Sequence, residues 1–192
     1  MRVISGTAKG RKLRRVPGDS TRPIMDRVKE NLFNILGDFV PDSRWLDLFA
    51  GTGQVGIEAL SRGAKHVVFV DKVAAAVRTT KSNLRHTGLE KGATVVQQDA
   101  FRFLESPSGA PFDLIYVAPP QYKGMWLAVL GAVDKDPQRL LDPDGLVVVQ
   151  IDPNEEAQVG DDGLGLQNLK ELDRRRYGST LLLFYELPES VT

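Results

Sequence analysis

The sequence predicts an α/β protein in which helices cover both faces of a mostly parallel sheet. Strand-like apolar runs alternate with helix-like segments between residues 44 and 152, and this alternation is typical of parallel sheets. A glycine-rich turn joins the first of these strands to the helix that follows it. The chain of 192 residues is long enough for one domain with a sizeable core.

Each element has its own signal in the sequence. Residues 24–36 predict a helix, because Val28, Leu32, Ile35 and Leu36 recur at helical spacing. Downstream, short apolar runs predict strands, and the segments between them predict helices. These elements alternate, beginning with a strand, at residues 44–50, 53–63, 66–71, 74–86, 93–99, 100–106, 112–120, 125–133 and 144–152.

Residues 166–187 depart from this alternation. They contain two strand-like runs on either side of Tyr177-Gly178, which is a typical turn composition. We therefore expect an antiparallel hairpin at an edge of the sheet.

The N-terminal residues combine a hairpin pattern with an excess of positive charge. Residues 2–5 and 11–16 flank a turn at residues 6–10 and predict a β-hairpin. The first 17 residues hold six basic side chains and no acidic one. Like charges repel unless something neutralises them, so we expect a polyanion to bind here; a solvated basic arm without a ligand is the alternative. The basic residues are Arg2, Lys9, Arg11, Lys12, Arg14 and Arg15.

Composition narrows the class of protein. The absence of cysteine excludes disulfides, thiolate metal sites and thiol catalysis. The two histidines, His66 and His86, do not lie at metal-ligand spacing, so no metal is expected. No apolar run approaches a membrane span, and the opening MRVISGTAKG lacks the apolar region of a secretory signal. We expect a cytoplasmic protein that needs no membrane.

The segment LDLFAGTGQVG at residues 46–56 carries the most specific motif. Its glycines, Gly51, Gly53 and Gly56, satisfy G-x-G-x-x-G and let the backbone approach a ligand. A dinucleotide is the obvious candidate, but Asp47 would repel a pyrophosphate and would pair with an ammonium group. S-adenosyl-L-methionine carries an ammonium and a sulfonium and no phosphate. The motif therefore predicts this cofactor.

Two further acidic residues end the next two strands. Asp71 lies twenty residues after Gly51, where it can accept hydrogen bonds from ribose hydroxyls. Asp99, followed by Ala100, can accept from an adenine amino group. Either residue alone could instead be a helix N-cap. Three acids at the carboxyl ends of three successive strands favour a cofactor site, because such sheets bind ligands at that edge.

The chain resembles the bacterial 16S rRNA guanine-N2 methyltransferases of the RsmD type. The resemblance implies a class I methyltransferase fold with a seven-stranded sheet, S-adenosylmethionine as cofactor, and an N2-methylated guanine in small-subunit rRNA as product. The blocks that carry it span nearly the whole chain: RVISGTAKGRKLRRVPG, RPIMDRVKENLFNIL, LDLFAGTGQVGIEALSRGA, VVFVDK, NL at Asn83-Leu84, QQDA and FDLIYVAPPQY.

The resemblance also implies further residues of the cofactor site. Arg22, Asp26 and Arg27 would lie near the pocket and help to close it; the alternative is a helix start with charged residues in its first turn. Phe49 and Thr52, in the glycine-rich turn, and Lys72, after Asp71, are also expected to bind the cofactor. We expect the chain to divide into a basic hairpin extension at residues 1–20 and a methyltransferase domain at residues 21–192.

The segment VAPPQY at residues 117–122 departs from the family pattern, which is Asn or Asp, two prolines, then Tyr or Phe. Ala118 stands where the family has an acceptor for the guanine amino group. The carbonyl of Pro119 remains as one acceptor, and Pro120 has no N–H to tie the loop back into the sheet. We expect Gln121 to supply the second acceptor and Tyr122 to stack on the base. The alternative places Gln121 on the surface and Tyr122 against the next helix.

Three classes of function remain open on the sequence alone. The first is a monomeric methyltransferase acting on 16S rRNA or on the assembled small ribosomal subunit. The second is a methyltransferase for DNA, another RNA or a small molecule. The third is a module that binds cofactor and RNA but is catalytically silent, which Ala118 suggests.

Overall fold

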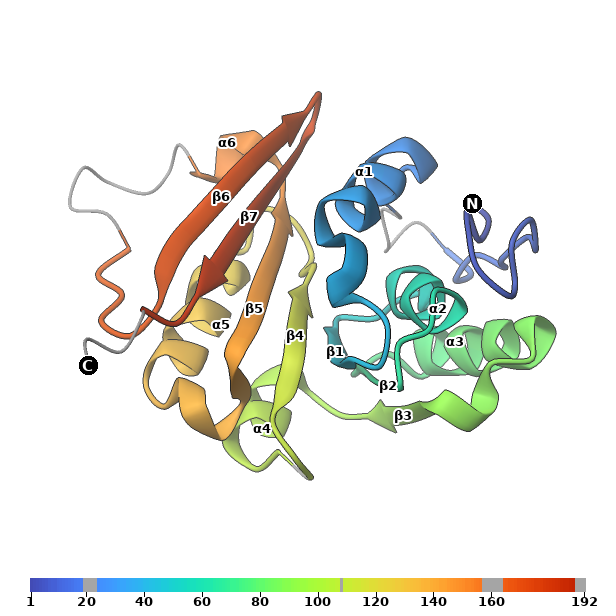
Figure 1. Cartoon of the computed structure of the whole chain (residues 1–192), viewed down its shortest axis with the longest axis horizontal. Helices are drawn as coiled ribbons and strands as arrows, with labels where there is room; N and C mark the ends of the chain where they lie inside the picture. Colours follow the sequence, from blue (N-terminus) through green and yellow to red (C-terminus); the bar gives the residue numbers. More distant parts are fainter. Residues whose placement is uncertain (19–23, 108, 157–163, 189–192) are drawn as a thin grey trace. The chain divides into compact units, whose positions relative to one another are not determined.

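Figure 1 shows a computed structural model of the chain, which describes residues 1–18, 24–107, 109–156 and 164–188. Seven strands form a mostly parallel sheet in the order β3-β2-β1-β4-β5-β7-β6. The predicted α/β class is confirmed. The chain divides into two compact units, Met1–Ala100 and Phe101–Thr192, which are described in turn.

The first unit contains three parallel strands with helices between them. Strand β1 pairs with β2, and β2 pairs with β3, so their carboxyl ends lie at one edge. Gly56 lets helix α2 approach β2, because a Cβ at this position would come within 2.3 Å of the Phe69 ring. The elements are α1 (Asp26–Leu36), β1 (Arg44–Leu48), α2 (Gln54–Ser61), β2 (His66–Asp71), α3 (Ala74–Thr87) and β3 (Ala93–Gln97).

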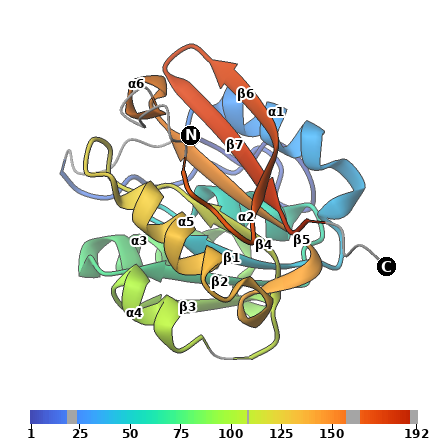
Figure 2. The ribbon, with the colours of Figure 1, turned by 90° about the vertical axis from the view of Figure 1, so that its left-hand side faces the viewer.

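The second unit combines a parallel strand pair with a C-terminal hairpin. Strand β4 pairs with β5 in parallel, whereas β5 pairs with β7 and β7 with β6 in antiparallel fashion. Figure 2 shows the β6–β7 hairpin, which turns at Gly178 (φ +60°) as predicted. The elements are α4 (Ala100–Glu105), whose first residue belongs to the first unit, β4 (Phe112–Val117), α5 (Met125–Asp134), β5 (Leu141–Ile151), α6 (Pro153–Glu156), β6 (Lys170–Tyr177) and β7 (Thr180–Glu186).

A buried aspartate fixes the approach to this hairpin. The carboxylate of Asp134, at the end of α5, accepts the backbone N–H groups of Gln167, Asn168 and Leu169 at 2.8 Å each. These donors would otherwise be unsatisfied at the entry to β6. Strand β6 is the last in the sheet order, so the predicted edge position is confirmed.

The predicted N-terminal hairpin forms only in part. Within the described residues, a single antiparallel bridge joins Arg2 and Lys12, and Val3 is bonded to the opposite arm: its N–H donates to the Arg11 carbonyl at 3.0 Å, and its carbonyl accepts the Gly10 N–H at 2.9 Å. The donors of the turn between the two arms bond to α2. Thr7 N–H donates to the Ser61 carbonyl at 2.8 Å, and Ala8 N–H donates to Ser61 Oγ at 2.9 Å.

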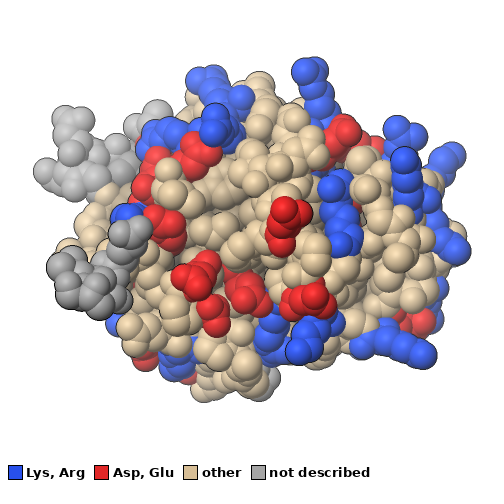
Figure 3. Space-filling model, in the orientation of Figure 1, with Lys and Arg blue, Asp and Glu red and all other residues tan. Residues whose placement is uncertain are grey.

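Residues 1–18, here called the N-terminal segment, follow α2 closely. Gly6 has φ +81°, and a Cβ there would lie 1.7 Å from the Ser61 carbonyl oxygen, so only glycine fits. The outer surface of the segment is basic: Lys and Arg side chains gather over it and over α3 at the right of Figure 3. The segment therefore has one face fixed to the protein and one open face of positive charge.

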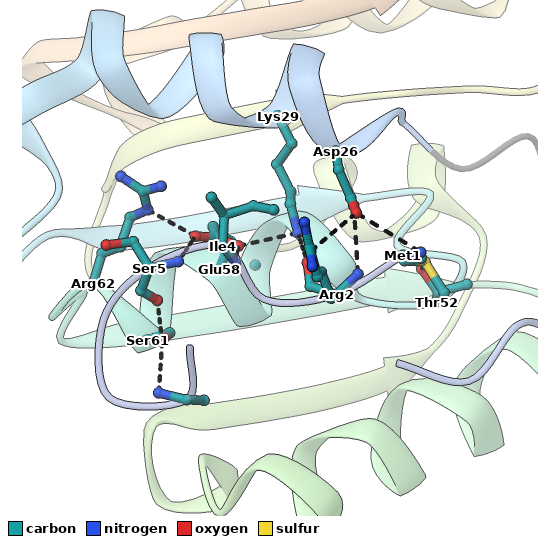
Figure 4. Close-up of polar contacts among 12 residues, drawn as sticks. Met1, Arg2, Ile4, Ser5, Asp26, Lys29, Thr52, Glu58, Ser61 and Arg62 are labelled. Carbon is teal, nitrogen blue, oxygen red and sulfur yellow. Dashed lines mark hydrogen bonds and ion pairs between the residues drawn. The ribbon is translucent and has the colours of Figure 1, made fainter. Parts of the chain in front are cut away.

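A buried ion pair between α1 and α2 anchors this segment (Figure 4). Lys29 Nζ lies 3.0 Å from Glu58 Oε2, and both side chains are fully buried. Glu58 also accepts the N–H groups of Ile4 and Ser5, at 2.8 and 2.9 Å, and Arg62 Nε at 2.8 Å. Burial lowers the pKa of Lys29, and its interaction with Glu58 opposes that shift. One carboxylate thus fixes two helices and the N-terminal segment together.

We predict that Glu58→Ala lowers the free energy of unfolding by about 3–5 kcal/mol, because it leaves the Lys29 charge buried without its partner. Glu30→Ala, at an exposed position of α1, is the control and should change it by less than about 0.5 kcal/mol. Denaturant unfolding followed by circular dichroism measures both. The double variant Lys29→Met/Glu58→Met should lower the free energy of unfolding by less than Glu58→Ala alone, because it leaves no buried charge without its partner. Equal losses for Glu58→Ala and Glu30→Ala would contradict the anchoring role.

Candidate functional site

The glycine-rich turn follows β1 and is built from residues in the left-handed conformation. Phe49, Gly51 and Gly53 have φ values of +60°, +57° and +73°. The expected strand at residues 44–50 therefore stops at Leu48. Positive φ at Phe49 is unusual for a residue with a side chain, and such positions concentrate at functional sites. The Ala50 N–H donates to the Val70 carbonyl at 3.0 Å, which fixes the turn beside β2.

Two carboxylates hold the backbone of this turn. Asp71 Oδ2 accepts the Gly51 N–H at 2.9 Å, and Asp47 Oδ2 accepts the Gly56 N–H at 3.2 Å. The Gly53 N–H donates to the Ala50 carbonyl at 2.7 Å. All three motif glycines thus give their N–H groups to acceptors within the protein. In a dinucleotide site such donors and the helix N-terminus would face phosphate.

Asp47 is almost completely inaccessible, with 2% of its surface exposed. Burial raises its pKa to about 8, the Gly56 N–H opposes the shift, and the nearby Asp71 adds to it. Asp47 is therefore protonated in the cofactor-free protein near neutral pH. A cation beside it would favour the ionised form.

Helix α3 supports the turn through two side-chain hydrogen bonds. Thr80 Oγ1 donates to the Gly51 carbonyl at 3.0 Å, and Asn83 Nδ2 donates to the Thr52 carbonyl at 2.9 Å. Asn83 is fully buried and also bonds both backbone groups of Arg14, accepting its N–H at 2.8 Å and donating to its carbonyl at 3.1 Å. Asn83 therefore links the turn to the N-terminal segment, a role that its place in a helix did not reveal.

Gln54, the first residue of α2, carries the clearest sign of a missing ligand beside the turn. The residue is 4% exposed, and its Oε1 has no hydrogen-bond partner among the described residues. Buried polar atoms are normally paired, so this acceptor calls for a donor from a bound molecule or from water. The sequence offered only one signal for it, a polar residue that directly follows the glycines.

The structure brings most of the expected cofactor residues of the first unit together. Asp71 ends β2, and Asp99 follows the neighbouring strand β3, so both lie at the edge that holds the turn. Lys72 is exposed, and Ala100 is buried. Asp71 also accepts the Val73 N–H at 2.8 Å, but Val73 is itself the N-cap of α3, so Asp71 is not the helix N-cap of the alternative interpretation.

Asp26 reaches the turn through the first residue of the chain (Figure 4). Its carboxylate lies 3.9 Å from the Met1 ammonium and 3.8 Å from Arg2 Nε. Thr52 Oγ1 in turn lies 3.5 Å from Met1 Sδ. Arg27 is exposed on α1, and Arg22 lies outside the described residues.

All six basic residues of the N-terminal segment are exposed. Two of them are partly engaged, since Arg2 pairs with Asp26 and Arg11 Nη1 donates to the His86 carbonyl at 2.8 Å. The other four have no hydrogen bond or ion pair from their side chains to any part of the chain that the structure describes. These four are Lys9, Lys12, Arg14 and Arg15.

The loop after β4 lies in the second unit. Ala118 is half-buried, Pro119 is buried and Pro120 is exposed, whereas Gln121 is half-buried. Tyr122 has φ +59° and is 56% exposed, so its ring does not pack away against the following helix. Its N–H donates to Glu155 Oε1 at 2.9 Å. Trp126, in contrast, is buried in the core.

Two negative findings apply to the described residues. No group of three or more acidic, His or Cys side chains is arranged to hold a metal ion. No described helix has the length and apolar character needed to cross a bilayer.

Comparisons with known proteins identify the family of the chain. Residues 1–186 match the family described as "Conserved hypothetical protein 95". The chain is 45% identical over 154 residues to the "Putative rRNA methyltransferase YlbH" of Bacillus subtilis, covering 79% of this chain and 83% of that protein. It is 40% identical over 122 residues to the "Ribosomal RNA small subunit methyltransferase D" of Haemophilus influenzae, covering 62% of this chain and 63% of that protein.

A solved structure agrees over almost the full length. The "Putative methyltransferase yhhF from Escherichia coli" superposes with a TM-score of 0.80 at 29% identity, and the match covers 99% of both chains. Because the family match extends over nearly all residues, the chain belongs to the conserved hypothetical protein 95 family, and its relatives there include proteins named as rRNA methyltransferases.

Proposed function

We propose that this protein transfers a methyl group from S-adenosylmethionine to ribosomal RNA. The observation that carries the cofactor assignment is the use of the glycine N–H groups. Gly51 and Gly56 donate to Asp71 and Asp47, so carboxyl oxygens occupy donors that would face phosphate in a nucleotide site. A ligand with an ammonium, a sulfonium and no phosphate is complementary to this surface.

The acceptors around the turn match that ligand. Asp47 and Gln54 Oε1 would hold the ammonium end, Asp71 the ribose hydroxyls and Asp99 the adenine amino group. Phe49, Thr52, Lys72 and Ala100 would line the same site, with Asp26 and Arg22 closing it. When bound, S-adenosylmethionine supplies an electrophilic methyl group on its sulfonium. The chain's own residues would orient this group.

For the substrate, we propose N2 of a guanine in small-subunit rRNA, acted on by a monomer in the cytoplasm. The exposed basic face of the N-terminal segment would bind phosphates. Guanine N2 is a poor nucleophile because its lone pair is delocalised into the ring. The Pro119 carbonyl and the Gln121 amide would accept its two N–H groups, the Tyr122 ring would stack on the flipped base, and the proton lost on methylation would pass to water.

A catalytically silent binding module is the second candidate, and Ala118 is the observation that favours it. The position where the family pattern has an acceptor holds a methyl group. Losing one preorganised polar group costs about 10²–10³ in rate. Correct positioning of the methyl donor can still supply much of the acceleration.

We predict that cofactor binding releases a proton from Asp47. The raised pKa of about 8 means that this carboxyl is protonated below that pH in the free protein, and a bound ammonium would ionise it. Calorimetry at pH 6.5 in two buffers of different ionisation enthalpy should show about one proton released, and the affinity should rise towards pH 8. Asp47→Asn should abolish both effects. Unchanged proton release in Asp47→Asn would remove Asp47 from the ammonium site.

The same pKa predicts how the stability of the cofactor-free protein changes with pH. The pKa of Asp47 in the folded protein lies above its value in the unfolded chain, which is about 3.9. The contribution of Asp47 to the free energy of unfolding is therefore fully present below about pH 4. It is lost as the pH rises through about 8. Asp47→Asn should therefore flatten the dependence of unfolding free energy on pH in this window. An identical pH profile in wild type and variant would contradict the raised pKa.

We predict that replacing Lys9, Lys12, Arg14 and Arg15 with Gln abolishes binding of a small-subunit rRNA transcript and leaves cofactor affinity unchanged. The wild-type affinity should fall steeply with salt. In a plot of the logarithm of the binding constant against the logarithm of the salt concentration, each phosphate contact should make the slope more negative by about 0.7–0.9. A matched control changes four exposed basic residues elsewhere to Gln: Lys65, Lys91, Arg102 and Lys135. Filter binding at several salt concentrations compares them. Equal losses in the two variants would indicate a general charge effect.

The activity itself is tested with labelled S-adenosylmethionine on unmethylated small subunits, free rRNA transcript and DNA. We expect methyl transfer to rRNA or the small subunit only, and N2-methylguanine by mass spectrometry of the nucleosides. In single-turnover reactions, Gln121→Ala should slow the chemical step and Tyr122→Ala should mainly weaken substrate binding. A silent wild type that Ala118→Asn makes active would instead establish the second candidate.

A further inference from the structure

The backbone of Tyr122 is held in a conformation that tyrosine rarely adopts. Its φ of +59° lies in the left-handed region, which disfavours residues with a Cβ. Tyr122 is also the most exposed of the large apolar and aromatic residues that the structure describes, with 56% of its surface accessible. Such strain persists only where surrounding contacts determine it, and it concentrates at sites of function.

One buried carboxylate supplies the contact. Glu155 lies in the short helix α6 and is 3% exposed. Its Oε1 accepts the Tyr122 N–H at 2.9 Å, and its Oε2 accepts the Asp152 N–H at 3.3 Å. A buried carboxylate needs such donors, and here one of them belongs to the strained residue.

The helix has other stabilising contacts of its own. Asp152 Oδ1 accepts the Asn154 N–H at 3.0 Å, and the Asp152 carbonyl accepts the Glu155 N–H at 2.9 Å. Asp152 therefore caps α6 without touching Tyr122. The Glu155–Tyr122 hydrogen bond is the part of this arrangement that reaches out of α6 to the loop after β4.

We propose that Glu155 is a positioning residue for the substrate base: it fixes the Tyr122 backbone so that the ring stands ready to stack. This inference rests on the proposed stacking role of Tyr122. A ring that is already fixed loses less conformational freedom when the base binds, so the hydrogen bond strengthens substrate binding without changing the chemical step.

The test measures single-turnover methylation of unmethylated small subunits against subunit concentration. Stacking on one aromatic ring contributes about 1–3 kcal/mol, so Tyr122→Ala should raise the half-saturating concentration roughly 5- to 150-fold. Glu155→Ala should raise it by a smaller factor, with the saturated rate and the cofactor affinity unchanged. In a Tyr122→Ala background, Glu155→Ala should have no further effect, because its action passes through the ring.

Two controls separate positioning from simple stability. Asp152→Ala removes a cap of α6 and should lower the melting temperature without changing half-saturation. Glu156→Ala, at the neighbouring residue that pairs with Arg174, should leave substrate binding as it is. If Glu155→Ala does not fold, Glu155→Gln carries the test, since an amide can accept only one of the two N–H groups.

The outcomes are distinguishable. The positioning role is overturned if the Glu155 variants leave the half-saturating subunit concentration unchanged. It is also overturned if they raise that concentration by the same factor with and without the Tyr122 ring. The proposed function stands in both cases. If Tyr122→Ala itself binds subunits as wild type does, the stacking role and the inference fall together. The inference is supported if Glu155→Ala raises the half-saturating concentration only when the Tyr122 ring is present and Asp152→Ala does not raise it.

Discussion

The hydrogen bond from the Gly51 N–H to the Asp71 carboxylate orders the turn after β1, on which the proposed cofactor site depends. It joins the end of β2 to the motif glycines, and Asp47 makes the equivalent contact with Gly56. A turn organised in this way has used its donors and gained two acids. The G-x-G-x-x-G pattern is therefore compatible with quite different ligands, and the neighbouring carboxylates decide between them.

The N-terminal segment shows how a basic surface can be held rigidly on this fold. Its six cationic side chains would repel one another on a free arm. Its backbone is instead bound by Glu58, Ser61 and Asn83, all of which are buried. Burying the Glu58 charge is tolerated because Lys29, Arg62 and two backbone N–H groups surround it. The basic face of this segment thus has a backbone that is fixed to the protein.

Much of this fold could be predicted from the sequence, because short, largely apolar strands alternate with helical segments. The acids at the strand ends could be located because each follows or ends such an apolar run. The N-terminal hairpin was predicted correctly in its reversal but not as a pair of strands, since one bridge joins its arms and the donors of its turn bond to α2. Glu58 and Glu155 were missed, because a glutamate in a helical segment normally faces solvent and nothing local marks one that accepts backbone N–H groups from elsewhere in the chain.

We propose that this turn selects a cationic methyl donor and rejects a pyrophosphate. Calorimetric titration of the wild-type protein with S-adenosylmethionine and, separately, with NADH compares the two ligands. We predict one-to-one binding of S-adenosylmethionine and affinity for NADH that is weaker by at least about a hundredfold, or roughly 2.7 kcal/mol. Binding of NADH as tight as that of S-adenosylmethionine would contradict it.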